Sequence, residues 1–307
     1  MRKKSSNAYL VECYIWLVNT IARKPITRAE IDEMWAHSAV NDYKQDYIPE
    51  SNFHRWRRAI ELMFDIEIKC DSLGRYYIEE EDKSRNAELH RRLLTMMGVN
   101  SLLKDSKELR DKILFESVPS GELYLAPIIE ALRDQYAIQM TYQGFGKPNP
   151  STFIVEPYCV KMFKQRWYVL ARSTGDKKLR VYGLDRIHAM EPTAQKFKIP
   201  DNFDAEQFFR DAYGVTVLGD QQQPEQIVIS IDEKQAKYLR TLPLHPSQKE
   251  IEPINGYPAF SFYVYPSDEF CQELFKYGSD LEVHEPQWLR EEFAKDAQKV
   301  NELYNLK

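Results

Sequence analysis

Apolar positions recur at helical spacing through most of the first 64 residues. Thr27 and Glu30 have the spacing of a capping box, which predicts a helix that begins after Thr27 and runs toward Trp35 or Ala39. A second amphipathic stretch covers residues 48–64, and a third precedes Pro25. The chain is therefore expected to open with three helices. The apolar positions that define the first and last of them are Tyr9, Leu10, Cys13, Trp16, Leu17, Ile21, Phe53, Trp56, Ile60 and Met63.

The pattern changes to that of strands at residues 66–79, where IEIKCDSLGRYYIE predicts two short strands around a turn at residues 71–74. Helices followed by such a hairpin predict a winged helix-turn-helix over residues 1–82. In that fold a recognition helix, here beginning near Ser51, presents its first residues to the major groove of DNA. Most contacts in such interfaces go to phosphate, so we expect phosphate contact for more than half of the candidates. These candidates are Ser51, Asn52, His54, Arg55, Arg57, Arg58 and Arg75.

The charge of this first block leaves an alternative open. Residues 1–80 contain 12 basic and 13 acidic residues, so the block is not basic in total. DNA affinity would have to come from a local cationic face and from the avidity of a dimer. The alternative is a module that binds another protein.

The rest of the chain predicts two further domains after a polar helical connection at residues 83–120. An amphipathic helix at 124–136 precedes four strand-like segments, 138–142, 153–158, 166–172 and 179–187, which predict a small barrel-like sheet over residues 121–218. Residues 219–307 begin with the linker-like run DQQQP and continue in the order β-α-β-β-α-β, followed by a helix. That order is typical of a ferredoxin-like unit. The predicted class is an α+β multidomain protein.

Charge is unevenly distributed along a chain whose net charge is −5. Residues 157–187 hold eight basic and two acidic residues, whereas residues 203–307 hold ten basic and nineteen acidic residues. Strand alternation would place Tyr168, Tyr182, Arg180 and Arg186 in one patch. Guanidinium groups suit phosphates and aromatic rings suit bases, so the patch would suit a nucleotide or a single strand. The alternative is a solvated charged face with Trp167 and Tyr168 in the core.

Three motifs resemble those of WYL-domain transcriptional regulators. Trp167-Tyr168-Val169 is similar to the Trp-Tyr-Leu signature, with valine at the leucine position. Leu179-Arg180-Val181-Tyr182 and Leu184-Asp185-Arg186-Ile187 resemble the strand that follows it, and residues 278–286 resemble a C-terminal extension that accompanies these domains. The resemblance implies an Sm-like or SH3-like β-barrel that senses a nucleotide or nucleic-acid ligand, and a homodimer whose winged helices bind operator half-sites.

The same resemblance suggests which residues bind the ligand. Tyr168, Arg180 and Arg186 are the first candidates because they lie in the motifs. The motifs do not fix the further candidates, which are Tyr142, Lys161, Arg166 and Tyr182.

Signatures of catalysis, metal binding and membrane insertion are not found in the sequence. GFGKPNP lacks the spacing of a phosphate-binding loop, and neither HExxH, GxSxG nor CxxC occurs. No apolar run approaches the roughly 20 residues of a membrane helix, and the N-terminus does not resemble a signal peptide. We therefore expect a cytoplasmic protein that is not an enzyme and that needs no cofactor, metal or membrane.

These patterns predict a ligand-responsive DNA-binding transcriptional regulator with a double-stranded operator, a nucleotide or oligonucleotide effector and a second copy of itself as partners. A different function stays open. The chain could be a non-transcriptional effector module that binds nucleic acid and modulates a partner enzyme through its acidic C-terminal region.

Overall fold

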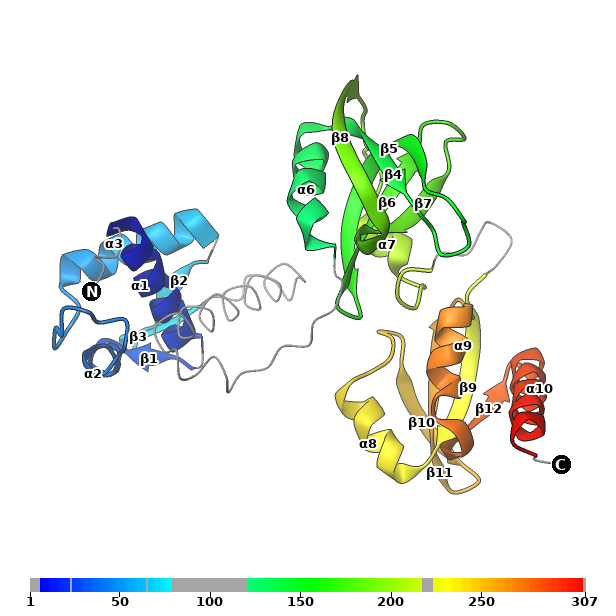
Figure 1. Cartoon of the computed structure of the whole chain (residues 1–307). Helices are drawn as coiled ribbons and strands as arrows, with labels where there is room; N and C mark the ends of the chain where they lie inside the picture. Colours follow the sequence, from blue (N-terminus) through cyan, green and yellow to red (C-terminus); the bar gives the residue numbers. More distant parts are fainter. Residues whose placement is uncertain (1–5, 23, 65, 79–120, 217–222, 306–307) are drawn as a thin grey trace. The chain divides into compact units, whose positions relative to one another are not determined.

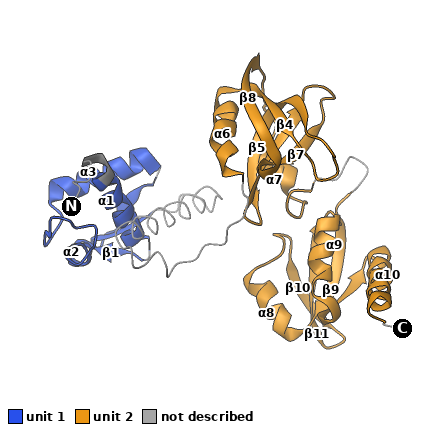
Figure 2. Ribbon diagram, viewed as in Figure 1, with its two compact units in different colours: residues 1–116 blue, residues 117–307 orange. Residues whose placement is uncertain are grey.

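The structure is a computed structural model that describes residues 6–22, 24–64, 66–78, 121–216 and 223–305. The chain divides into two compact units, residues 1–116 and 117–307 (Figure 2). The predicted connection at 83–120 lies outside the described residues. The predicted domain boundaries, 1–82, 83–120, 121–218 and 219–307, stay predictions.

The first unit packs three helices against a small sheet (Figure 1). The helices are α1 (Ser6–Ile21), α2 (Arg28–Ala36) and α3 (Glu50–Phe64), and the strands are β1 (Ile26–Thr27), β2 (Ile68–Cys70) and β3 (Arg75–Ile78), paired antiparallel in the order β1-β3-β2. The three predicted helices and the hairpin are confirmed, whereas β1 was not predicted. This arrangement is compatible with a winged helix.

Local sequence accounts for the ends and the packing of these helices. The capping box is present, because the backbone N–H of Thr27 donates to Glu30 Oε2 at 2.8 Å and the N–H of Glu30 donates to Thr27 Oγ1 at 3.3 Å. Trp35 and Trp56 pack edge to face in the core with a ring separation of 5.4 Å. Met63 was expected on the buried face of α3, but it is 55% exposed, whereas its neighbour Phe64 packs against the core.

The second unit begins with a five-stranded antiparallel sheet. After a 3₁₀ turn, η1 (Glu122–Tyr124), and α6 (Leu125–Asp134) come β4 (Tyr136–Tyr142), β5 (Ser151–Phe163), β6 (Arg166–Ser173), β7 (Leu179–Gly183) and β8 (Ile187–Lys196), in the order β7-β6-β5-β4-β8. Within the described residues β7 and β8 are not paired, so the sheet is open and the predicted closed barrel is not found. The sheet buries both faces. Val169 and Ala171 pack toward α6, and Leu170 packs toward α7 (Ala205–Phe209).

A second antiparallel sheet follows in the same unit. Its elements are β9 (Glu225–Ile231), α8 (Glu233–Thr241), β10 (Lys249–Ile254), β11 (Tyr257–Val264), α9 (Asp268–Phe275), β12 (Leu281–Glu285) and α10 (Gln287–Tyr304), with strand order β10-β11-β9-β12. The predicted β-α-β-β-α-β order and the final helix are confirmed. Phe260, Phe262 and Phe270 fill the core between the sheet and its helices.

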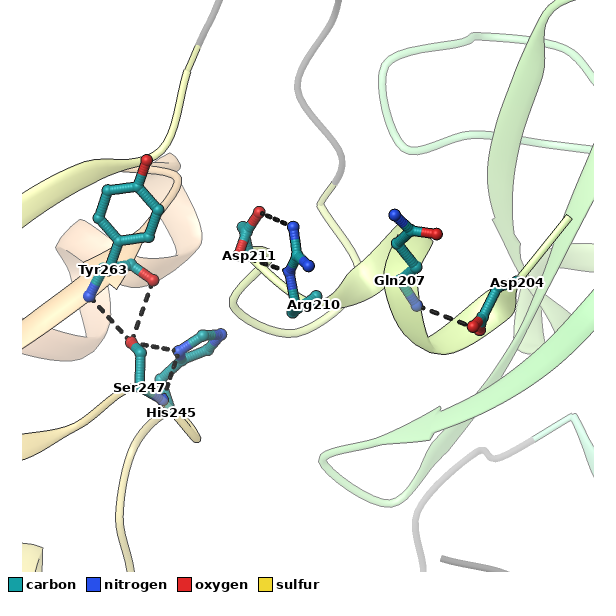
Figure 3. Close-up of polar contacts among 7 residues, drawn as sticks. All are labelled: Asp204, Gln207, Arg210, Asp211, His245, Ser247 and Tyr263. Atoms are coloured by element: carbon teal, nitrogen blue, oxygen red, sulfur yellow. Dashed lines mark hydrogen bonds and ion pairs between the residues drawn. The ribbon is translucent and has the colours of Figure 1, made fainter. Parts of the chain in front are cut away.

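The segment after α7 joins the two sheets of this unit. Figure 3 shows polar contacts in and around it: Arg210 bonds to Asp211 within the segment, Asp204 accepts the N–H of Gln207 at the start of α7, and Ser247 before β10 bonds both to His245 Nδ1 and to the backbone of Tyr263. The N–H of Tyr265 donates to the carbonyl of Asp211 at 2.7 Å. These contacts attach the segment and the loop before β10 to β11.

An ion-pair network reinforces this junction. The carboxylate of Glu273 on α9 is 8% exposed and accepts from Lys164 Nζ at 2.7 Å and from Lys276. Burial alone would raise the pKa of Glu273, but hydrogen bonds from Lys164, Lys276 and Tyr213 outweigh burial and lower it to about 2.

We expect Glu273→Gln to reduce stability most at neutral pH. A lowered pKa means that the carboxylate stabilises the fold above its ordinary pKa, and that this contribution is lost as the pH falls toward 2. The loss at pH 7 should be about 1–2 kcal/mol, because both lysine side chains are half exposed to water. Urea unfolding from pH 7 to pH 2 measures it, with Glu191→Gln as an exposed control. A constant difference between Glu273→Gln and the wild type across that range would contradict the assignment.

Candidate functional site

The pairing of β6 with β7 decides which of the predicted ligand residues share a face. Tyr168 lies opposite Gly183, Val169 opposite Tyr182, and Ala171 opposite Arg180. Residues opposite each other point to the same side of a sheet. The predicted patch that joined Tyr168 with Tyr182 and Arg180 is therefore wrong, since the register puts Tyr182 and Arg180 on the face toward α6 and Tyr168 on the other.

Arg180 and Tyr182 lie on the α6 side of the sheet, away from Tyr168, and Tyr182 contacts the candidate Tyr142. Arg180 is exposed and binds Asp176 in the β6–β7 turn with both Nη atoms. Tyr182 is 7% exposed and packs against Tyr142 at a ring separation of 5.2 Å. Their ligand-binding roles stay predictions.

The chain does not continue as a strand after Gly183 but forms a 3₁₀ turn, η2 (Leu184–Arg186). This turn directs Asp185 and Arg186 toward Arg166 on β6. Arg166 Nη1 donates to Asp185 Oδ2 at 3.2 Å, and Arg186 Nε lies 3.8 Å from Asp185 Oδ1. We call Arg166, Tyr168, Asp185 and Arg186 the Arg186 site.

Two buried polar atoms of the Arg186 site have no hydrogen-bond partner within the part of the chain that the structure describes. They are Asp185 Oδ1 and Arg186 Nε, whose 3.8 Å separation is too long for a hydrogen bond. Leaving a buried polar group unpaired costs about 1–3 kcal/mol and more when it is charged. Four further buried side-chain atoms of the described residues also lack a hydrogen-bond partner: Arg28 Nε, Trp35 Nε1, Trp56 Nε1 and Arg57 Nε. In the Arg186 site the two atoms are a carboxylate acceptor and a cationic donor that face each other as a long ion pair.

Gly183 is required by the close packing of these groups. A β-carbon at this position would lie 2.5 Å from Arg186 Nη2 and 2.6 Å from Asp185 Oδ1. The guanidinium and the carboxylate thus occupy space that any other residue would fill.

Gly121 makes a second close contact with η2. It has a φ of +72°, and a β-carbon there would lie 2.3 Å from the carbonyl carbon of Leu184. The backbone at the start of the second unit thus touches the backbone that carries Asp185 and Arg186.

Tyr168 lies where the Arg186 site meets the second sheet. Burial raises the pKa of Tyr168, the nearby Glu269 of α9 raises it further, and Arg166 and Arg186 oppose the increase. Glu269 Oε2 in turn accepts from Thr216 Oγ1 at 2.9 Å. Lys161 is paired with Tyr168 across the strands, and its ammonium donates to the carbonyl of Gly214 and lies 4.3 Å from the ring of Phe209.

The predicted site residues did not include Gly183, Asp185 and Phe145. Phe145 lies in the β4–β5 loop, 4.7 Å from the guanidinium carbon of Arg186, and Tyr142 lies 5.6 Å from the same carbon. A glycine directly before Leu-Asp-Arg was a usable signal for Gly183 and Asp185, because glycine often marks a strand end or a close approach. No signal in the sequence connects the loop to Arg186.

The DNA-binding candidates occupy several parts of the first unit. Ser51, His54, Arg55 and Arg58 on α3 are exposed, and Asn52 is half-buried with its Oδ1 accepting from Arg55 at 2.9 Å. Arg57 instead packs back on the hairpin, where it donates to the carbonyl of Ile68 and lies 5.2 Å from the Tyr76 ring. Arg75 pairs with Asp71 at the hairpin turn at 2.8 Å.

Comparison with known families defines the class of the second unit. The model of the WYL domain matches residues 124–192, which include the first sheet as far as Pro192, together with η2 and the Arg186 site. The model of the WCX domain matches residues 223–300, which comprise the second sheet. The chain thus carries a WYL domain followed by a WCX domain.

Two solved structures align with most of this chain. Proteasome accessory factor B/C (PafBC) of Arthrobacter aurescens aligns over 98% of this chain and 48% of its own, with 19% identity and a TM-score of 0.39, so this chain spans about half of its length. A CRISPR Cas-related protein aligns over 97% of this chain and 84% of its own, with 12% identity and a TM-score of 0.41. A search of curated proteins finds no match.

The residues that the structure describes contain neither a metal-binding cluster nor a membrane-spanning helix. Among those that the structure describes, no group of three or more histidine, cysteine or acidic residues could hold a metal ion. None of the helices in these ranges is long and apolar enough to cross a membrane.

We expect Gly183→Ala to displace Arg186 without unfolding the protein. The backbone at Gly183 has φ −73° and ψ 130°, which alanine adopts freely, so only the side-chain ends must move. Loss of a charge-assisted hydrogen bond should weaken the binding of a short single-stranded oligonucleotide by about tenfold to a hundredfold. Fluorescence anisotropy and Tm measure the two effects, with Gly175→Ala in the β6–β7 turn as control. Unchanged affinity in Gly183→Ala would argue against ligand binding by Arg186.

Proposed function

We propose that this protein is a DNA-binding regulator whose WYL domain senses a nucleotide or nucleic-acid ligand at the Arg186 site. Asp185 Oδ1 and Arg186 Nε carry this proposal, because they are buried, lie 3.8 Å apart without a hydrogen bond, and would both be satisfied by a ligand that donates to one and accepts from the other. A guanidinium binds phosphate through parallel N–H groups, which suits a nucleotide.

α3 supports the assignment of DNA binding to the first unit. His54, Arg55 and Arg58 lie on its exposed side, opposite the core residues Phe53, Trp56 and Ile60. Arg58 has no ion-pair partner among the described residues, so its guanidinium is available for a phosphate or a guanine edge. The negative total charge of the protein makes binding depend on this local face and on a second copy of the chain.

The contact between Gly121 and Leu184 is the point at which we propose that ligand binding is coupled to the rest of the chain. A ligand that shifts η2 must also shift the backbone at Gly121, because no side chain lies between them to absorb the movement. The proposed consequence is a change in operator affinity by a coupling free energy of about 1–3 kcal/mol, or roughly 5-fold to 150-fold. The proposal needs no catalytic step, cofactor or metal.

A second candidate function is a WYL effector module that binds nucleic acid and acts on a partner protein. The acidic C-terminal region favours it, since residues 203–307 hold nineteen acidic and ten basic residues. The two functions differ in whether the first unit binds duplex DNA with sequence preference.

Duplex binding is the first test. We expect the full chain to bind DNA from its own upstream region with an affinity that falls as salt increases. Arg55→Ala/Arg58→Ala should weaken this binding and reduce the salt slope by about two, if both guanidinium groups contact phosphate. The control is Arg133→Ala/Lys198→Ala, which removes equal charge from exposed positions of the second unit. Anisotropy over a salt series, with unrelated duplex as competitor, measures both quantities.

The outcomes separate the two functions. Specific duplex binding that only the α3 variant loses supports the regulator. Absence of specific duplex binding, together with single-strand binding that Arg186→Ala loses, supports the effector module instead.

Ligand coupling is the second test. A single-stranded oligonucleotide should change duplex affinity in the wild type but not in Arg166→Ala/Arg186→Ala. Arg180→Ala should reduce the effect less, because Arg180 lies on the other face of the sheet and is held by Asp176. If the oligonucleotide shifts duplex affinity equally in all three proteins, sensing at the Arg186 site is wrong.

A further inference from the structure

Phe145 is an exposed aromatic ring in contact with the cation of the Arg186 site. It is 80% exposed, and its ring centroid lies 4.7 Å from the guanidinium carbon of Arg186. A single exposed apolar side chain is ordinary on a protein surface. This one differs because it covers an arginine whose Nε has no partner among the described residues.

The loop that carries Phe145 is attached to the backbone of η2. The N–H of Gln143 donates to the carbonyl of Arg186 at 3.1 Å, at the point where β4 ends. Gln143 Nε2 lies 3.2 Å from the carbonyls of Lys147 and Pro148, and the N–H of Lys147 donates to the carbonyl of Gly144 at 2.9 Å. These bonds close the loop on both sides of Phe145, so the ring and the guanidinium are positioned by one continuous set of hydrogen bonds.

The stacked pair leaves two kinds of surface available. A guanidinium that lies over a ring keeps its N–H groups in its own plane, where they can reach a phosphate. The ring keeps most of its surface in water, and an aromatic face of this kind binds a nucleobase by stacking. Phosphate and base are joined in every nucleotide at a short separation, which matches an aromatic ring placed directly beside a cation.

We propose that Phe145 is the base-stacking residue of the Arg186 site, and that the ligand is a phosphorylated nucleoside whose phosphate binds Arg186. This inference rests on the proposed function and narrows its ligand: the base contributes to affinity through its ring, not through a particular hydrogen-bonding edge. The nucleoside can be a free nucleotide or part of a single strand. Both share the chemistry of base and phosphate.

Binding of matched ligands with and without bases tests the proposal. The probes are a short mixed-sequence single-stranded DNA, an abasic strand of equal length, the four nucleoside monophosphates and ribose 5-phosphate. We expect Phe145→Ala to weaken the base-bearing ligands by about tenfold to a hundredfold and to leave the abasic strand and ribose 5-phosphate unaffected. Phe145→Tyr should retain wild-type affinity. Leu242→Ala, which removes a side chain that is 77% exposed on the second sheet's domain, is the control for loss of an exposed apolar group.

The outcomes distinguish this inference from the proposed function. If the wild type binds DNA strands and Arg186→Ala does not, but Phe145→Ala binds them as tightly as the wild type, stacking is wrong and sensing at Arg186 stands. If the abasic strand binds the wild type as tightly as normal DNA, stacking is again wrong. If the wild type binds none of these probes, both proposals fail. Comparing the monophosphates with the strand decides between a free nucleotide and a single strand as the source.

A fluorescent variant gives a second readout. Phe145→Trp keeps an aromatic ring at an exposed position, so the fold should tolerate it. Its emission should be quenched when a base stacks on it and should not change with the abasic strand. Saturation with normal DNA without any change in emission would overturn the proposal.

Discussion

β7 ends at Gly183, and the polar groups of the Arg186 site fill the volume that a β-carbon would occupy there. The turn η2 follows this glycine, so the side chains of Asp185 and Arg186 no longer alternate between the two faces of the sheet. Asp185 instead accepts a hydrogen bond from Arg166. This arrangement has an energetic cost, because Asp185 Oδ1 and Arg186 Nε are buried without a hydrogen-bond partner among the described residues. The surrounding sheet, with cores on both faces, provides the stability that keeps them in place.

The concentration of positive charge in residues 157–187 has a structural explanation as well as a functional one. Five of its eight cations are ion-paired with carboxylates: Lys164 with Glu273, Arg166 and Arg186 with Asp185, Arg172 with Glu156 and Arg180 with Asp176. Lys161 donates to the carbonyl of Gly214. Most of the apparent basic patch therefore links strands, turns and the two sheets. Arg186 differs, since its Nε lies 3.8 Å from Asp185 Oδ1 and lacks a hydrogen bond within the described ranges, and this is the reason for proposing it as a ligand-binding residue.

Periodicity was sufficient to predict most elements of this fold. Local patterns predicted the helices of the first unit and the capping box at Thr27. They also predicted the β-α-β-β-α-β order of elements along the chain in the domain of the second sheet, and the structure reproduces all three. The site was harder to predict, because a shift of one residue between β6 and β7 exchanges the faces, and the alternation of the strands does not reveal the register that the turn at residues 173–178 sets. Arg57 on α3 was also predicted from local sequence alone. Its position on the helix suggested a DNA contact, whereas in the structure it donates a hydrogen bond to the carbonyl of Ile68 on the hairpin. Contacts between distant segments, such as that of Phe145 with Arg186, cannot be predicted from the hydrophobic periodicity of helices or strands.

The backbone contact at Gly121 has a practical meaning for protein engineering. The WYL and WCX domains form one compact unit, and Gly121 is its first described residue. A reporter domain fused just before Gly121 would be joined to the residue whose backbone contacts η2, the turn that carries Asp185 and Arg186. A fusion made after Gly121 would remove that contact with η2. Under the proposed function, Gly121 is therefore the junction at which a different output domain could be attached.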